Sequence, residues 1–389
     1  MVSMIRTYEE INEKIESGKA NVISAFEAKS VIKDKGVKSF LNNVDVVTCA
    51  SFEMNTNASL YMSFGQTDPL IYFSEAYLND VLAYPTGPTD LLLSSVAFSK
   101  DKPEYGGAHI IEDLVAGKDV HLKVSGKNLQ VFPNRDFETW FKLDDLNCIN
   151  LFLNQAINQN DIVATNSGDI DINSHMGTLI AHLENSTYNS SSFLNPLIND
   201  PLCKTIGVGT RVWIAGGVGY ITGYGSNHNP AQRKNEYGVP VGNAVTLSAI
   251  GDLRGMKKKW IRGGYLKSFG PVLYVGVGVP IPVLNEEIVN FLAITDEHIH
   301  TTMFDFSIPR RTKPILGQCP YSELRTSTIL INKKSTLSAP LSSMSGAIEI
   351  CNLTKEAILE KTLFLSKPLE PINMNVKQKV LNSRLPELV

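Results

Sequence analysis

Residues 24–49, SAFEAKSVIKDKGVKSFLNNVDVVTC, decide the fold class of this chain. Ser24 followed three positions later by Glu27 has the spacing of a capping box, which begins a helix. Val44–Thr48 is a short β-branched run, which favours a buried strand. We predict a helix and then a strand that ends at Cys49. A thiol at the mouth of a strand occupies a common place for chemistry on α/β scaffolds.

Similar elements are expected on both sides of this stretch. Upstream, Thr7 and Glu10 form another capping box, and Gly36 is expected to end the second helix. Downstream, we predict strands at 91–98, 120–124, 245–250, 272–277 and 329–331, a hairpin at 209–225, and helices at 110–116, 143–156 and 343–360. The sequence predicts a mixed α/β (α+β) fold, with mixed sheets, interspersed helices and an undetermined strand order. We expect residues 1–389 to form a single catalytic domain, with room for two lobes and without an appended regulatory or ferredoxin domain.

The composition excludes several classes of protein. The chain has 389 residues, a net charge of −3, 43% hydrophobic residues and 19% charged residues. The chain has no excess of basic residues, which argues against a nucleic-acid-binding protein. Its content of hydrophobic residues argues against a disordered protein. The longest apolar run, 271–284, contains two internal prolines and is shorter than the ~20 residues of a spanning helix. The charged N-terminus does not suit a secretory signal, so we expect a cytoplasmic protein that binds neither nucleic acid nor membrane.

Metal and nucleotide sites are not indicated. The five cysteines are odd in number and scattered, so they form neither a disulfide framework nor a C-x-x-C metal pattern. His298 and His300 lack a third ligand at a recognisable spacing. The glycine clusters at 207–209, 216–219 and 276–278 match no phosphate-binding motif, and glycine within strands usually marks a bulge or close backbone approach. The polar segment 226–242 is expected to be a lid or a plain surface loop.

Two residues stand out as chemical candidates from local context alone. Cys49 precedes a stretch rich in hydroxyls and amides, residues 50–57, which can donate hydrogen bonds to a carbonyl oxygen or carboxylate. Its thiol is a competent nucleophile only as a thiolate. His109 follows two glycines and leads into a helix, so it is either an acid/base group or a helix cap.

Several blocks resemble a known family. Residues 43–69, NVDVVTCASFEMNTNASLYMSFGQTDP, are similar to the opening block of the homocysteine-biosynthesis family, long described as a domain of unknown function. That family reads V-D-V-V-T-T-G-T-F-G-P-M-C-S-S-G and then F-L-N-F-G-H-S-D-P-P. Further similar blocks are 77–80, 105–117, 205–211, 273–282, 284–287 and 321–325. The resemblance covers about Ile23 to Pro368.

The resemblance implies an enzyme that incorporates sulfur. The activity characterised in the family converts aspartate semialdehyde to homocysteine, with sulfur carried on cysteine and electrons supplied by a ferredoxin-like partner. It implies no tightly bound cofactor, an external sulfur donor and reductant, and a small-molecule substrate. It also implies an electron-transfer or sulfur-carrier protein as partner, and a homo-oligomer.

This chain departs from the family at its two cysteines. Their positions are occupied by Thr56 and Val131, neither of which can carry sulfane sulfur. Cys49 lies seven residues before Thr56. Three interpretations stay open: Cys49 has become the thiol nucleophile, the pocket performs non-sulfur chemistry on a related small carboxylated carbonyl compound, or the chain is a non-catalytic binding subunit.

The remaining candidates are predicted to bind or act on the substrate. Arg135 and Arg211 suit a substrate carboxylate, although an ordinary ion pair is an equal alternative. Possible neutral donors are Asn55, Thr56, Asn166 and Ser167, together with Thr210. His228, on the expected lid, is a candidate acid/base or substrate-binding group beside the catalytic candidates Cys49 and His109.

Overall fold

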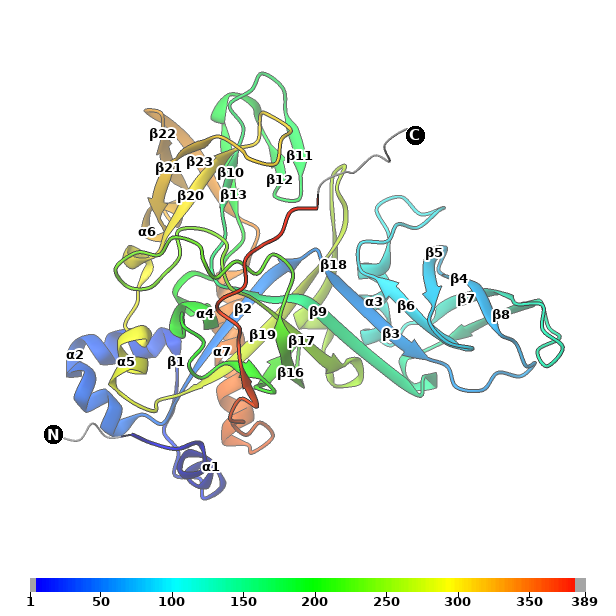
Figure 1. The fold of residues 1–389 in the computed structure, drawn as a ribbon, viewed down its shortest axis with the longest axis horizontal. Coiled ribbons are helices and arrows are strands. Elements are labelled where there is room, and N and C mark those ends of the chain that lie inside the picture. Colours follow the sequence, from blue (N-terminus) through cyan, green and yellow to red (C-terminus); the bar gives the residue numbers. More distant parts are fainter. Residues whose placement is uncertain (1–4, 382–389) are drawn as a thin grey trace, which may run out of the picture.

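A long mixed sheet carries most of the core in the computed structural model, which describes residues 5–381 (Figure 1). Its strands follow the spatial order β1 (Val22–Ser24), β2 (Val46–Asn55), β19 (Gly270–Pro282), β15 (Arg211–Ile214), β16 (Gly217–Tyr224), β17 (Thr246–Asp252), β9 (Cys148–Asn158), β3 (Ala58–Ser63), β6 (Asp90–Ser94), β5 (Val81–Pro85), β4 (Phe73–Leu78), β7 (Val120–Gly126) and β8 (Asp136–Phe141). β18 (Ile261–Leu266) pairs with β19 outside this path. β1 and β2 are parallel, whereas β19 is antiparallel to β2, to β15 and to β18.

The two N-terminal capping boxes are confirmed. Thr7 caps α1 (Tyr8–Glu16), and Ser24 caps α2 (Ala25–Asn43) with the reciprocal bond from Glu27. Gly36 interrupts the second helix as expected, because its φ of 76° and ψ of 164° are non-helical, and a further helical segment then continues to Asn43.

The strand after α2 is longer than predicted. β2 does not end at Cys49, because all ten of its residues pair with β19, from Val46 opposite Pro282 to Asn55 opposite Leu273. The thiol therefore lies in the middle of a central strand and not at its mouth.

Helices cover the faces of the large sheet. α7 (Met344–Leu359), which confirms the helix expected at 343–360, packs on β2 and β19. A Cβ on Gly276 would stand 2.5 Å from Ile350, and one on Gly278 would overlap Thr354. These glycines therefore permit the close packing of α7 on β19. α3 (Gly107–Val115) packs on β18.

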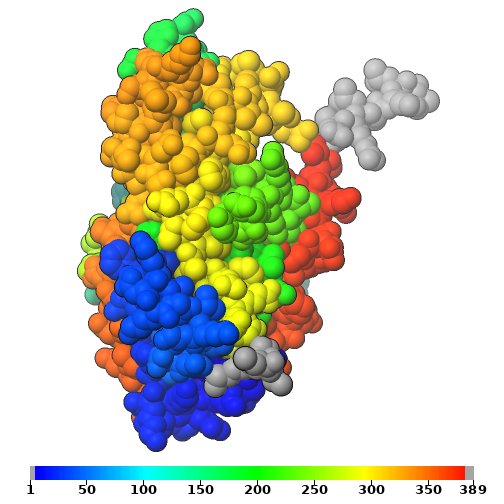
Figure 2. Space-filling model, turned by 90° about the vertical axis from the view of Figure 1, so that its left-hand side faces the viewer, coloured from blue at the N-terminus to red at the C-terminus, as the bar shows by residue number. Residues whose placement is uncertain are grey.

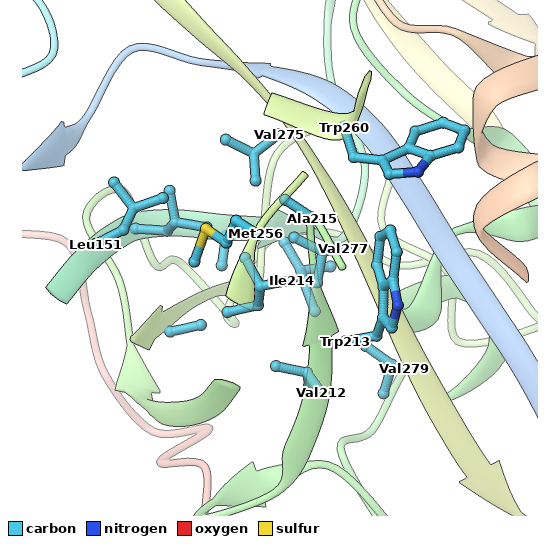
Figure 3. Close-up of a cluster of buried hydrophobic side chains, with 14 of the residues drawn as sticks. Leu151, Val212, Trp213, Ile214, Ala215, Met256, Trp260, Val275, Val277 and Val279 are labelled. Atoms are coloured by element: carbon cyan, nitrogen blue, oxygen red, sulfur yellow. The ribbon is translucent and has the colours of Figure 1, made fainter. Parts of the chain in front are cut away.

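Aromatic and aliphatic side chains fill the space between these layers. Figure 3 shows Trp213 beside Trp260, with ring centroids 6.2 Å apart in an edge-on arrangement. Such geometry adds to the favourable burial of large rings. Labelled neighbours in the same cluster include Val275, Val277 and Met256.

A second sheet lies above the first in Figure 1 and has a hydrophobic cluster of its own. Its order is β21 (Ile315–Pro320), β20 (His300–Asp305), β10 (Val163–Thr165), β13 (Asn185–Tyr188), β23 (Lys334–Pro340) and β22 (Thr328–Ile331). The pairs β10–β20 and β13–β23 are parallel. The mixed α/β class is thereby confirmed, whereas the single-domain prediction stays a prediction.

Shorter elements complete the described chain. Two small sheets pair β11 (Ile172–Ser174) with β12 (Gly177–Leu179) and β14 (Gly207–Val208) with β24 (Glu370–Pro371). The short helices are α4 (Pro196–Asn199), α5 (Glu286–Leu292), α6 (Tyr321–Leu324) and six 3-10 turns, η1 (Leu143–Asp145), η2 (Ala181–Leu183), η3 (Ser192–Leu194), η4 (Leu253–Gly255), η5 (Lys258–Trp260) and η6 (Asp296–His298).

One predicted helix is wrong. Residues 143–156 form η1 followed by β9, because β9 buries Ile149, Leu151 and Leu153 with the alternation of a strand between β3 and β17.

The structure confirms the other expected elements with shifted ends: the remaining strands, the helix at 110–116 and the hairpin at 209–225. Segment 226–242 contains no helix or strand, as expected. Over residues 5–381, no helix is long and apolar enough to cross a membrane.

Candidate active site between the two sheets

A polar segment, residues 189–195, joins the second sheet to β2. The side chain of Asn189 donates to the carbonyl of Met54 and accepts from its N–H, both at 3.1 Å. The backbone N–H of Ser191 donates to the Glu53 carboxyl at 2.8 Å. Since Glu53 and Met54 belong to β2, these bonds fix the register of the two sheets against each other.

Two carboxyl groups with raised pKa values, those of Glu53 and Asp161, lie where the two sheets meet. Glu53 is only 6% exposed, and burial raises its pKa to about 7 despite the bonds from Ser191 and Asn195. Burial raises the pKa of Asp161 to about 8, and the nearby charge of Glu53 adds to this rise. Carboxyl groups with pKa values near neutrality can exchange protons during a reaction at physiological pH.

A first pocket, which we call the serine pocket, opens beside this junction with a volume of about 170 Å³. It is lined by Tyr188, Ser190, Ser192, Leu324, Arg325, Ser327, Ser338, Pro340, Ser342 and Met344. The buried hydroxyl of Ser338 has no hydrogen-bond partner among residues 5–381. Arg325 donates to Asp296 at 2.6 Å, and Ser192 also bonds Asp296.

A second pocket, the lysine pocket, has a volume of about 480 Å³. Asp296 lines it and also bonds Arg325 and Ser192 of the serine pocket. It is lined by Phe26, Lys29, Ser30, Lys33, Phe193, Thr295, Asp296, Glu297 and Ser322. Figure 2 shows the blue N-terminal part of the chain, which contains α2, lying against yellow surface; α2 contacts α5, and the segment after α5 supplies residues 295–297 of the lining. The pocket thus presents two ammonium groups from one helix and two carboxylates from the opposite segment.

Lys29 is the most unusual residue of this pocket. Its Nζ donates to Oδ1 of Asn199 at 2.6 Å and to the carbonyl of Leu292 at 2.7 Å. Burial lowers the pKa of its ammonium group to about 8, although Cys49, Asp296 and Cys351 favour the charged form. An amine with this pKa is neutral in part at pH 7 and is then nucleophilic.

Cys49 lies behind these groups and not in a pocket. Its side chain is 0% exposed, in the middle of β2 and opposite Val279. Burial raises the pKa of the thiol well above its usual range, and Cys351 adds to the rise while Lys29 opposes it. A substrate does not reach this sulfur in the described conformation, so its role as nucleophile stays a prediction that requires an opening of the core.

Asn55 and Thr56 lie near the segment that contains His228. The side chain of Asn55 donates to the carbonyl of Gln155 at 2.9 Å, and Asn57 donates to Ser226 at 2.7 Å. The structure therefore brings the β2–β3 turn to the segment 226–242. Val131, at the second family cysteine position, is 69% exposed on the loop between β7 and β8.

His228 is buried, although the segment that contains it was expected to be a lid or a plain surface loop. Its Nδ1 accepts from the N–H of Thr246 at 3.2 Å, its Nε2 bonds the carbonyl of Asn373 at 2.9 Å, and its ring stacks on Tyr224. Burial lowers the pKa of the imidazole. These contacts fix the neutral tautomer with the proton on Nε2.

His109 takes the capping arrangement that was one of its two interpretations. Its Nδ1 accepts from the N–H of Gly106 at 3.2 Å, and its ring stacks on Tyr105. Burial lowers its pKa. Any catalytic role must therefore be compatible with this cap at the start of α3.

The arginines and the neutral donors have other partners. Arg135 is exposed and bonds Asn128, while the N–H of Arg211 donates to Ser366 at 2.7 Å. In the second sheet, Asn166 donates to the carbonyls of Ile170 and Leu179, and Ser167 bonds Asp305. None of the ten sequence candidates lines the serine or the lysine pocket.

The residues that do line the pockets had weak sequence signals. Arg325 belongs to block 321–325, whose only sequence signal is its family resemblance. Lys29 has no local signal, because it is one of several lysines on a helix. Among the described residues, no group of three or more His, Cys, Asp or Glu side chains could hold a metal ion.

Comparisons with known proteins point in one direction. The model of the family described as "Homocysteine biosynthesis enzyme, sulfur-incorporation" matches residues 20–365. A protein of Methanosarcina acetivorans named L-aspartate semialdehyde sulfurtransferase is 35% identical over 370 residues, covering 95% of this chain and 72% of the relative. A protein of the same name from Methanocaldococcus jannaschii is 35% identical over 386 residues, covering 95% and 74%. An uncharacterized protein of Methanothermobacter thermautotrophicus is 27% identical over 311 residues, covering 77% and 68%. No solved structure matches the chain.

Proposed function

Because this chain belongs to the family of homocysteine biosynthesis enzymes that incorporate sulfur, we propose that it transfers sulfur to a small carboxylated aldehyde bound in the lysine pocket. L-Aspartate semialdehyde, which the names of two relatives contain, is the substrate that we assign to it. The family match over residues 20–365 is the observation that carries this proposal.

The charges of the lysine pocket support this substrate. L-Aspartate semialdehyde has a carboxylate and an ammonium group at one end and an aldehyde at the other. Lys33 can pair with the carboxylate, and Asp296 and Glu297 with the ammonium group. Lys29 and Lys33 are four residues apart on α2, a spacing that places their Cβ atoms ~5–6 Å apart on one face. The two ends of a four-carbon substrate can therefore meet different lysines.

The overall reaction needs a sulfur donor and a reductant. Sulfide replaces the carbonyl oxygen, which leaves as water, and two electrons then bring the carbon to the thiol level. We propose that the sulfur donor and the reductant are supplied from outside the chain, by a sulfur-carrier or electron-transfer protein or by small molecules. Cys49 would take part only if the core around β2 opens.

Thr56 and Val131 at the positions of the family cysteines favour a second candidate function. In this alternative the same pocket binds the same class of substrate and performs non-sulfur chemistry on it. The substrate then reacts without any sulfur appearing in the product.

A panel of aldehydes tests the proposed substrate. The purified chain is incubated with sulfide, dithiothreitol and L-aspartate semialdehyde, succinic semialdehyde or butyraldehyde, and the thiol products are measured by mass spectrometry. We expect homocysteine from L-aspartate semialdehyde. For the other two aldehydes, kcat/KM should fall at least ~10-fold for each charged group that the substrate lacks, since a charge-assisted bond contributes about 1.5–3 kcal/mol. Equal rates for the three aldehydes would contradict the proposed recognition, and consumption of the aldehyde without a thiol product would support the second candidate.

Variants of α2 test the pocket itself. Lys33→Met is expected to raise KM by ~10-fold or more with little change in kcat, because the lost contact is present in both substrate and transition state. Lys35→Met is the matched control, since Lys35 is exposed on the same helix and does not line the pocket. The same rise in KM for both variants would show that the lysine pocket does not hold the carboxylate.

A further inference from the structure

We propose that Lys29 is an amine nucleophile that forms an imine with the aldehyde carbon in the lysine pocket. The identity of the aldehyde rests on the proposed function, whereas the reactivity of the amine does not. Nothing in the comparisons assigns a role to this lysine.

The hydrogen bonds of Nζ are those that a neutral amine can satisfy. Its two acceptors, Oδ1 of Asn199 and the carbonyl of Leu292, are uncharged and come from α4 and from the end of α5. A neutral amine has two N–H groups, which these acceptors take, and its lone pair is left for the pocket. Among residues 5–381, no carboxylate lies within 4.0 Å of Nζ, so no ion pair holds the group in its charged form.

The pocket gives this lone pair a place to react. Lys29 lines the same cavity of about 480 Å³ as Phe26, Phe193 and Asp296, and Nζ stands 6.0 Å from the centroid of the Phe193 ring. An aromatic wall reduces the water around the amine and accommodates the carbon chain of a small aldehyde.

The electrostatic surroundings favour the reactive form of the amine. Burial lowers the pKa of Lys29 to about 8, against the opposing influence of Cys49, Asp296 and Cys351. At pH 7 the neutral fraction is then roughly 200-fold larger than for a lysine with the usual pKa of about 10.4. Lys33 and Glu297 are the other charged groups that line this pocket.

The chemical step is balanced without any oxidant or reductant. The lone pair of Nζ forms a bond to the carbonyl carbon, and a proton moves from the nitrogen to the oxygen to give a neutral carbinolamine. The hydroxyl then takes one proton from the medium and leaves as water, and a protonated imine remains. Its carbon is more electrophilic than that of the aldehyde, so sulfide can add to it and Lys29 can leave as the amine.

Reductive trapping tests this step directly. The intact chain is incubated at pH 7 with L-aspartate semialdehyde and sodium cyanoborohydride, which converts an imine into a stable secondary amine. Peptide mapping by mass spectrometry then locates the label. We expect Lys29 to be labelled at least ~10-fold faster than Lys35, in a 1:1 adduct, and the rate to rise with pH up to about 8. Equal labelling of the two lysines, or labelling that spares Lys29, would overturn the proposal.

Two variants separate a chemical role from a structural one. Lys29→Arg keeps donors for Asn199 and Leu292 but cannot form an imine, so we expect the trapped adduct to disappear and kcat to fall at least ~100-fold, with an unchanged circular dichroism spectrum. Lys35→Arg is the control and is expected to behave as the wild type. If Lys29→Arg is misfolded, the trapping result on the wild type still decides.

The outcomes also separate this inference from the proposed function. An adduct at Lys29 without homocysteine would keep the reactive amine and overturn the sulfur transfer. Homocysteine formed at the normal rate by Lys29→Arg would keep the function and overturn the imine.

Discussion

The buried carboxyl of Glu53 makes the strongest prediction about stability. Its hydrogen-bond partners are neutral donors, Ser191 and Asn195, and no cation pairs with it among residues 5–381. Burial raises its pKa from 4.5 to about 7, so the folded protein prefers the protonated acid. The contribution of this group to stability is complete below pH 4.5 and is lost as the pH rises towards 7.

The size of this effect follows from the shift. Since one pKa unit corresponds to about 1.4 kcal/mol, ionisation of Glu53 costs the folded state about 3 kcal/mol at pH 8. Glu53→Gln removes the charge and keeps an oxygen for Ser191 and Asn195. We therefore expect the variant to be more stable than the wild type at pH 8, by about 2–3 kcal/mol, and to differ from it by less than about 1 kcal/mol at pH 4.5.

Urea unfolding at the two pH values measures this difference, with tryptophan fluorescence and circular dichroism as probes. Glu13→Gln is the matched control, because Glu13 is an exposed residue of α1, and it should change little at either pH. A Glu53→Gln protein that is less stable than the wild type by the same amount at both pH values would refute the reasoning. It would mean that the carboxylate is solvated or paired in solution.

Three further predictions concern other parts of the chain. Under native conditions Cys148, the partly exposed cysteine, should react with Ellman's reagent before the four buried ones, and a second fast thiol would contradict the burial described here. Gly209→Ala should lower the free energy of unfolding by about 1–2 kcal/mol and speed proteolysis of the C-terminal segment. The reason is that φ of Gly209 is +83° and the new Cβ would stand 3.0 Å from Leu369. Unchanged proteolysis would argue against this contact. Asp45→Asn should lower the free energy of unfolding by about 3 kcal/mol in a urea titration, because it leaves the guanidinium of Arg6 buried without its carboxylate; a loss below about 1 kcal/mol would contradict this.

Local sequence signals predicted the structure correctly where contacts between near neighbours in the chain determine it. The capping boxes at Thr7 and Ser24 and the helix after Ser343 depend on bonds within four residues, and all three are present. The segment 143–156 was assigned to the wrong class, because a short apolar run fits a helix as well as a strand until its partners β3 and β17 are known.

The pockets depend on contacts that no local pattern contains. The two acceptors of Lys29 lie 170 and 263 positions away in the chain. Cys49 was expected at a strand end, because the continuation of β2 is fixed by its pairing with β19. The family resemblance predicted the chemistry correctly at the level of sulfur incorporation, but it pointed to cysteine positions that hold Thr56 and Val131 here.

The destination of sulfur tests the central claim most directly. The purified chain is given L-aspartate semialdehyde, dithiothreitol and sulfide enriched in a heavy sulfur isotope, and homocysteine is analysed by mass spectrometry against a reaction without protein. The account predicts labelled homocysteine, formed much faster with the protein than without it and suppressed in Lys29→Arg. Aldehyde that is converted to a product without the isotope, or a rate equal to that of the protein-free reaction, would contradict it.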